Sequence, residues 1–285
     1  MSGLSRNFPI FAVALIALSL TPASRAQSRA SCTFHTFGLP SSPQIFVNGV
    51  NDYGTVVGAA NFGNREVPQF KAFIHYSNGN TTYWLPSGAK SSGFGGRNDS
   101  GVTTGAYVDS SNQRHVFLLK GSTLTPISRP AGANPLGINK YNSVVGNYVD
   151  SSAKTHGFKR YSNGSTIHLN YPSATATFAN GINDRGGIVG FYFGSDGAEH
   201  GFIYHNGAWA KLQFPNAPLS TELYGISNGG VIVGQGQSHA YLYQNGTAKE
   251  IIVPGSNQTE VRAIAPGGLI AGMGDLTHGF WAACH

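Results

Sequence analysis

Short apolar stretches alternate with turn residues along the chain, and residues 175–215 show this pattern most clearly. Stretches rich in β-branched and aromatic residues predict four strands, at 175–183, 187–193, 200–205 and 209–214. Asn183-Asp184-Arg185-Gly186 and Asn206-Gly207 lie between strands and have the residue types that tight turns require. No stretch of this segment has the period of a helix. The pattern therefore predicts four consecutive antiparallel strands.

The same order of strands and turns recurs six times. The second strand of each unit contains a glycine, and these residues are Gly58, Gly105, Gly146, Gly190, Gly234 and Gly272. They are 47, 41, 44, 44 and 38 residues apart. A period of about 40 residues with four strands in each unit is typical of propeller blades. We therefore predict an all-β fold, a six-bladed β-propeller of four-stranded antiparallel blades.

The ends of the chain are out of phase with this repeat. Five fourth strands are followed by a proline, at Pro86, Pro130, Pro172, Pro215 and Pro254. The last unit, residues 258–285, stops after its third strand, whereas residues 31–39 resemble a fourth strand and end at Pro40. We expect residues 31–39 to complete the last blade, because this arrangement closes the ring and leaves no open sheet edge at the seam.

The chain has two cysteines, Cys32 and Cys284, one near each end of the predicted propeller. Closure of the last blade by the N-terminal strand would place them on neighbouring strands. The prediction is a disulfide bond between them, which the chain-entropy model values at about 4–5 kcal/mol. The alternative is two free thiols.

The third strands share a triplet of histidine, a small residue and an aromatic residue. It occurs at His115-Val116-Phe117, His156-Gly157-Phe158, His200-Gly201-Phe202, His239-Ala240-Tyr241 and His278-Gly279-Phe280, whereas the first blade has Lys71-Ala72-Phe73. In this motif the chain resembles the HAF-repeat family of extracellular proteins, over nearly all of its mature length. The resemblance implies secretion and a β-propeller, but no particular reaction. Because the histidine recurs at the same place in five of the six blades, we expect it to bond turn backbone rather than to bind a metal.

The first residues have the character of a signal peptide, predicted for residues 1–26. Arg6 precedes an apolar run at 8–20, and small residues follow at 21–26. The alternative is a membrane anchor, but a run of about 13 apolar residues is short for a span. Residues 27–285 would then form a single β-propeller domain, secreted or periplasmic, monomeric, and without a membrane segment after cleavage.

The charge pattern excludes some classes of partner. The net charge is +6, yet charged residues are only 11% of the chain, so a shortage of acids rather than a basic patch explains the balance. Nucleic-acid binding is therefore not predicted. The sequence has no HExxH, GxSxG, CxxC or phosphate-binding motif, so no cofactor and no metal site is predicted. The turns at Asp109 and Asp150 have one carboxylate each, too few for calcium.

Candidate functional residues lie where the blades differ. Two alternating positions vary in each predicted first strand, namely Phe46 and Asn48, Gly93 and Gly95, Asn134 and Leu136, Phe178 and Asn180, Glu222 and Tyr224, Glu260 and Arg262. Because side chains alternate along a strand, both members of each pair should face the central channel. Glu222, Tyr224, Glu260 and Arg262 form a candidate ligand-binding cluster in adjacent blades, with Phe178 and Asn180 in the blade before them.

These features favour a secreted binding or interaction module. Its ligand would be a carbohydrate or a peptide, such as a polysaccharide or a cell-surface component, bound at the channel mouth. The alternative is an enzyme acting on extracellular polysaccharide, a glycoside hydrolase or a lyase, because two carboxylates with a tyrosine and an arginine can perform acid–base chemistry. A third alternative is a purely structural envelope protein. The sequence leaves the three open.

Overall fold

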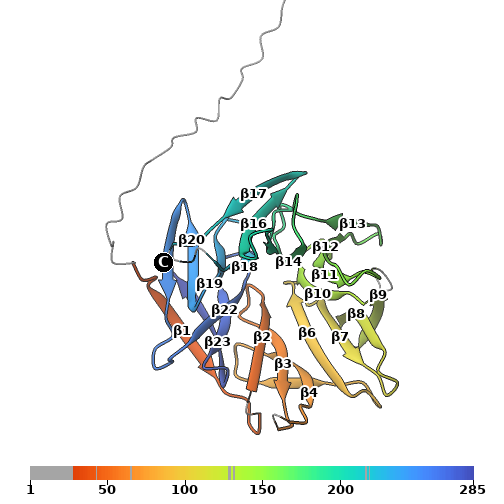
Figure 1. Ribbon diagram of the computed structural model, residues 1–285. Coiled ribbons are helices and arrows are strands. Elements are labelled where there is room, and N and C mark those ends of the chain that lie inside the picture. The colour runs from red at the N-terminus through yellow and green to blue at the C-terminus, as the bar shows by residue number, and fades with distance from the viewer. Residues whose placement is uncertain are drawn as a thin grey trace, which may run out of the picture.

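The computed structural model describes residues 28–285, except 43, 65, 128–129, 131, 216 and 218. In this part of the chain, 24 strands form six four-stranded antiparallel sheets that surround a central channel (Figure 1). The predicted six-bladed propeller is confirmed. The predicted signal peptide, residues 1–26, lies outside the described residues. No helix long and apolar enough to cross a membrane is found in the described part of the chain.

Each blade except the last is a run of four consecutive strands. Blade one contains β2 (Gln44–Val50), β3 (Val56–Asn61), β4 (Phe70–His75) and β5 (Thr81–Trp84). Blade two contains β6 (Ser91–Arg97), β7 (Thr103–Val108), β8 (Arg114–Lys120) and β9 (Thr123–Ile127). Blade three contains β10 (Asn134–Ile138), β11 (Val144–Val149), β12 (Thr155–Arg160) and β13 (Thr166–Leu169).

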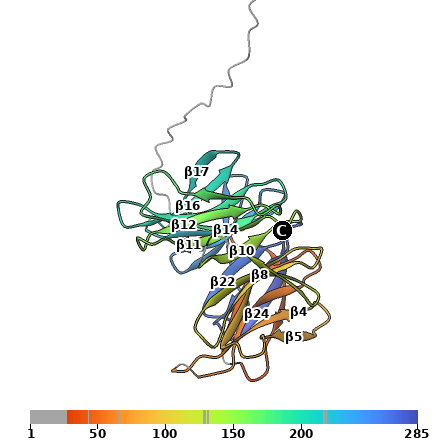
Figure 2. The ribbon, with the colours of Figure 1, turned by 90° about the vertical axis from the view of Figure 1, so that its right-hand side faces the viewer.

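The second half of the ring repeats this order. Blade four contains β14 (Ala176–Ile182), β15 (Ile188–Phe193), β16 (Glu199–His205) and β17 (Ala208–Leu212). Blade five contains β18 (Thr221–Ile226), β19 (Ile232–Gly236), β20 (His239–Gln244) and β21 (Thr247–Ile251). Blade six contains β22 (Thr259–Ile264), β23 (Ile270–Gly274), β24 (His278–Cys284) and, as its outer strand, β1 (Cys32–Phe37). The first strand of each blade lies at the channel, and outer strands such as β5 and β17 lie at the rim (Figures 1 and 2).

The seam joins the two ends of the chain as predicted. β1 pairs with β24 in antiparallel register, with Cys32 opposite Cys284, and a disulfide bond links these two residues across a sequence separation of 252. On the other side of blade six, the carboxylate of Asp52 in blade one accepts a hydrogen bond from the backbone N–H of Gly267 at 2.7 Å. Blade six is therefore bound to blade one by polar contacts and closed within itself by a covalent bond.

The third-strand triplet has a packing explanation. Its aromatic residues are among the largest side chains with almost no exposure, and they are Phe73, Phe117, Phe158, Phe202, Tyr241 and Phe280. In blades two to four the histidine beside them bonds a carboxylate in the turn before its strand, rather than the predicted turn backbone. His156 Nε2, for example, lies 2.8 Å from Asp150 Oδ2, while Asp150 Oδ1 accepts bonds from Ser152 and Lys154 N–H. The carboxylate thus organises the turn and anchors the histidine. In blade five His239 instead faces Glu250 on strand β21, and in blade six His278 contacts the hydroxyl of Ser256.

Asparagines of the first turns tie neighbouring blades together. The side-chain amide of Asn98 donates to the carbonyl of Asn139, that of Asn139 to the carbonyl of Asn183, and that of Asn183 to the carbonyl of Ser227, at 3.0, 3.2 and 3.0 Å. These bonds satisfy buried polar groups at the inner ends of blades two to five. They fix the spacing of the inner strands, and hence the width of the channel.

The glycines that mark the repeat allow the inner strands to bulge. β14 and β15 change register between Ala179 and Gly181, and the equivalent shift occurs in every blade. A Cβ on Gly190 would collide with the carbonyl oxygen of Phe178, and one on Gly234 with that of Glu222, each closer than 3.0 Å. The repeated glycine is therefore required because a first-strand carbonyl lies against it. The strand glycines place the residues of the channel mouth.

Candidate functional site

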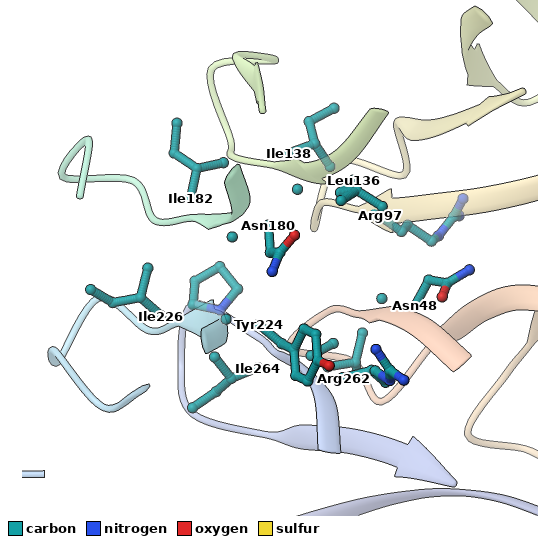
Figure 3. A pocket seen from close by; sticks show the side chains of 18 residues that line it. Asn48, Arg97, Leu136, Ile138, Asn180, Ile182, Tyr224, Ile226, Arg262 and Ile264 are labelled. Carbon is teal, nitrogen blue, oxygen red and sulfur yellow. The ribbon is translucent and has the colours of Figure 1, made fainter. Parts of the chain in front are cut away.

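Two rows of residues from the inner strands surround one end of the channel. The first row is Phe46, Gly93, Asn134, Phe178, Glu222 and Glu260, and the second row is Asn48, Gly95, Leu136, Asn180, Tyr224 and Arg262. These are the varying positions that the sequence identified. We call this end, where the inner strands begin, the mouth face. Figure 3 shows second-row side chains from different blades around the channel.

The structure brings four of the predicted residues together at the mouth face. The Tyr224 hydroxyl donates to Glu222 Oε2 at 2.6 Å. Arg262 donates from Nε and Nη2 to Glu260 Oε2 at 2.9 and 2.6 Å. The two pairs meet where the Arg262 guanidinium lies over the Tyr224 ring, 4.4 Å from Cζ to the ring centroid (Figure 3). The result is one connected chain of contacts, Glu222–Tyr224–Arg262–Glu260, across blades five and six.

Burial shifts the acid–base behaviour of this cluster. Loss of water raises the pKa of Glu222, although the hydrogen bond from Tyr224 opposes the shift. Burial also raises the pKa of Tyr224 well above its ordinary value, so its hydroxyl remains a proton donor. Burial disfavours the charge on Arg262, but Tyr224 and Glu260 outweigh that effect and raise its pKa. The cluster therefore presents a guanidinium that stays charged at Arg262, a neutral hydroxyl at Tyr224, and a carboxyl group at Glu222 that takes up a proton more readily than usual.

Phe178 and Asn180 lie beside this cluster with different surroundings. Phe178 stacks on Phe191 of the neighbouring strand β15, with ring centroids 4.6 Å apart. Asn180 donates its side-chain amide to the carbonyl of Leu223 in the next blade at 2.9 Å. Part of the Asn180 amide is thus used by the scaffold, and its position at the channel follows from that bond.

A cavity of about 260 Å³ lies at the mouth face, and we call it the mouth cavity. It is lined by Asn48, Asn134, Leu136, Asn180, Phe191, Glu222, Tyr224 and Arg262. Deeper in the channel the free volume falls to about 50 Å³, where aliphatic side chains such as Ile182, Ile226 and Ile264 enclose it (Figure 3). The channel is therefore open to a small molecule at the mouth face and narrow beyond the second row.

Sequence reasoning missed one wall of this cavity. Phe191, rather than its stacking partner Phe178, lines it, and Glu260 supports Arg262 without lining it. The signal for Phe191 was present, because it directly follows the repeated glycine Gly190 and pairs with Phe178 across the strands. Asn48, Asn134 and Leu136 also line the cavity; they belong to the two varying rows but not to the predicted cluster.

The described residues include no group of three or more His, Cys, Asp or Glu side chains placed to share a metal ion. The histidines of blades two to four instead face separate turn carboxylates, as in the pairs His115–Asp109 and His200–Asp196 at 2.8 and 2.9 Å. Their positions are explained by the hairpins that they support.

Comparison with known proteins identifies the fold and not the family. No family model matches the sequence, and no curated protein matches it significantly. The fold is similar to that of a gluconolactonase from Xanthomonas campestris, with a TM-score of 0.53 and 9% identity over 93% of this chain and 97% of that one. Membership of the HAF-repeat family therefore stays a prediction.

Two further solved structures show the same architecture. A mutant of the Aleuria aurantia lectin, in complex with α-methyl-L-fucoside, has a TM-score of 0.50 and 14% identity over 87% of this chain and 93% of that one. AofleA from Arthrobotrys oligospora has a TM-score of 0.52 and 10% identity over 91% of this chain and 94% of that one. At such low identity the likeness shows the propeller fold alone.

Proposed function

We propose that this protein is a secreted carbohydrate-binding propeller that holds a sugar in the mouth cavity. One observation carries the proposal: the cavity combines a carboxylate, a hydroxyl, a guanidinium and amides with an aromatic wall at Phe191. Binding pockets generally pair apolar walls with a few convergent polar groups. The mature chain would be residues 27–285, a single domain that acts as a monomer outside the cytoplasm.

The chemistry of sugars matches this set of side chains. A sugar ring has hydroxyls that donate and accept hydrogen bonds around its edge, and C–H groups that form apolar faces. Planar polar groups such as those of Glu222 and Arg262 can bond adjacent hydroxyls in pairs. The Phe191 ring offers an apolar surface for a C–H face. The Aleuria aurantia lectin, bound to a fucoside, supports the proposal only in that the same fold can present such a site.

The enzymatic alternative rests on the hydrogen bond between Tyr224 and Glu222 at 2.6 Å, since a tyrosine beside a carboxylate can act as a nucleophile or base. Two observations favour binding instead. The pKa of Tyr224 is raised by burial, whereas a tyrosine that gives up its proton needs a lowered one. Glu260 Oε2 accepts two hydrogen bonds from Arg262, so this carboxylate supports the guanidinium and is not aimed at a substrate in the cavity.

The test is a glycan array on the mature protein, followed by calorimetry with the best ligand. Glu222→Gln and Tyr224→Phe should each weaken binding by roughly tenfold, because each removes a polar contact from the cavity. Glu250→Gln is the matched control, since Glu250 lies on the outer strand β21 of the same blade. Equal affinity of Glu222→Gln and wild type would overturn the proposed site, and release of reducing ends from the bound glycan would establish the enzyme instead.

A further inference from the structure

Blade two differs from every other blade at the mouth face. It has glycine in both rows, Gly93 and Gly95, where the other blades have side chains. A depression of about 290 Å³ lies over this blade, with Phe70, Tyr107 and Arg114 among its lining residues. Its lining and that of the mouth cavity share Asn48, Asn134 and Leu136. The two hollows therefore adjoin across the channel.

The fold requires only one of these two glycines. A Cβ on Gly95 would collide with Thr104 Oγ1 and with the carbonyl oxygen of Pro135, so the approach of blade three excludes any side chain there. A Cβ on Gly93 would meet only the Cβ of Ala59, at 3.6 Å, an ordinary contact. Blades one and four have phenylalanine at the equivalent position. The open space above Gly93 is therefore not explained by packing.

Arg114 is the only charged residue that lines the depression. Its Nη2 donates to Asn134 Oδ1 at 2.8 Å and its Nε to the carbonyl of Ala133 at 3.2 Å. These bonds use two of its five N–H donors. None of the ion pairs among the described residues includes Arg114. The depression thus has an oriented guanidinium on its wall that no carboxylate of the described chain neutralises.

We propose that the ligand is an acidic polysaccharide that lies across the mouth face, with one sugar unit in the mouth cavity and an anionic unit over blade two. The carboxylate or sulfate of that second unit would bind the free N–H groups of Arg114, since guanidinium recognises both oxyanions in paired geometry. The glutamates of blades five and six disfavour an anionic unit in the mouth cavity, so the two subsites together favour a chain in which neutral and anionic units alternate. This inference rests on the proposed function and adds the class of ligand.

The experiment uses calorimetry on the mature protein with defined tetrasaccharides. The acidic probes are tetrasaccharides in which neutral and anionic units alternate, unsulfated chondroitin for the carboxylate and keratan sulfate for the sulfate. Their neutral counterparts are the methyl ester and the desulfated form. We expect at least one acidic probe to bind on the order of tenfold more tightly than its neutral counterpart, the effect of one hydrogen bond to a charged group. Arg114→Gln should abolish this difference, and Arg114→Lys should restore part of it.

A second variant tests the space rather than the charge. Gly93→Phe copies the phenylalanine of blades one and four, and its cross-strand partner Ala106 corresponds to Ala59 opposite Phe46. The variant should fold, fill the depression, and weaken tetrasaccharide binding on the order of tenfold while leaving a disaccharide unaffected. Gly93→Ala, which adds one methyl group, controls for the loss of glycine.

The outcomes separate the two proposals. If saccharides bind in a Glu222-dependent manner, but Arg114→Gln and Gly93→Phe bind the acidic tetrasaccharides like wild type, the second subsite is wrong and the mouth cavity stands. If no saccharide binds the wild type, both are wrong. A preference for acidic probes that survives Arg114→Gln also overturns the assignment to blade two.

Discussion

The disulfide at the seam gives the most quantitative prediction. Replacing both Cys32 and Cys284 by alanine frees a loop that spans almost the whole described chain, with a sequence separation of 252. For this loop the chain-entropy formula gives a loss of about 5.5 kcal/mol of unfolding free energy, slightly above the range of about 4–5 kcal/mol expected from the sequence, and an upper value because measured losses are commonly about 2–5 kcal/mol. For a chain of this size each kcal/mol lowers the melting temperature by about 2–4 °C, so we expect a fall of roughly 10–20 °C.

The loss should also be local in its first effect. β1 is held to β24 by its strand pairing and by contacts such as the edge-on packing of Phe34 against Phe280, at 5.4 Å between centroids. Without the disulfide, β1 is an outer strand at a chain end and should open before the rest of the ring. Thermal melts followed by circular dichroism measure the fall in melting temperature, and hydrogen exchange on β1 and β24 measures the early opening of the seam. A melting temperature within 2 °C of wild type, or uniform loss of protection around the ring, would refute this reasoning.

Three further changes test the scaffold and the cluster. Gly234→Ala should lower the free energy of unfolding by about 1–3 kcal/mol in denaturant titrations, because the new Cβ collides with the carbonyl of Glu222. Gly229→Ala is the control and should cost less than about 1 kcal/mol, because its Cβ meets only a side chain at 3.7 Å; equal losses would contradict the bulge explanation. The pKa of Glu222 is raised by burial, so the folded state binds this proton more tightly and stability should fall as the pH rises above about 4.5. Thermal melts of Glu222→Gln across this pH range should lack the fall. If the melting temperatures of wild type and variant change with pH in parallel, the carboxyl of Glu222 is not the cause. The pKa of Asp150 is lowered chiefly by the hydrogen bond to His156, so Asp150→Asn should lower the melting temperature at neutral pH. Below the lowered pKa the variant and the wild type should melt at the same temperature. If the difference in melting temperature persists in acid, this pair is not its cause.

The repeat and its phase could be predicted from the sequence because both depend on local rules. Turn residues and alternating apolar positions define each strand, and six copies of the pattern confirm one another. Counting the strands shows that blade six lacks an outer strand. Completing it with the N-terminal strand places the two cysteines on neighbouring strands. The varying rows of the inner strands were also accessible, because alternation assigns a face to each residue.

The three-dimensional surroundings of these residues were not accessible in the same way. The sequence does not show that Glu260 would hold Arg262 rather than line the cavity, since that depends on side-chain conformation two residues along a bulged strand. The repeated glycine locates Phe191 opposite Phe178, but which of the two stacked rings lines the cavity depends on their side-chain conformations. In blades two to four, the partners of the repeated histidines lie in turns whose shape depends on hydrogen bonds to the same carboxylates.

The shared construction of blade six has a consequence for assembly. Of the described strands β1 is made first and its partner β24 last, so β1 must wait unpaired until the other strands have been made. During that interval every copy offers the same free strand and, later, the same open edge on β24. At high concentration a strand from one molecule can complete the blade of another, which is a domain swap. The cysteines would then lock such a chain of molecules covalently, so dilution during refolding should favour the closed ring.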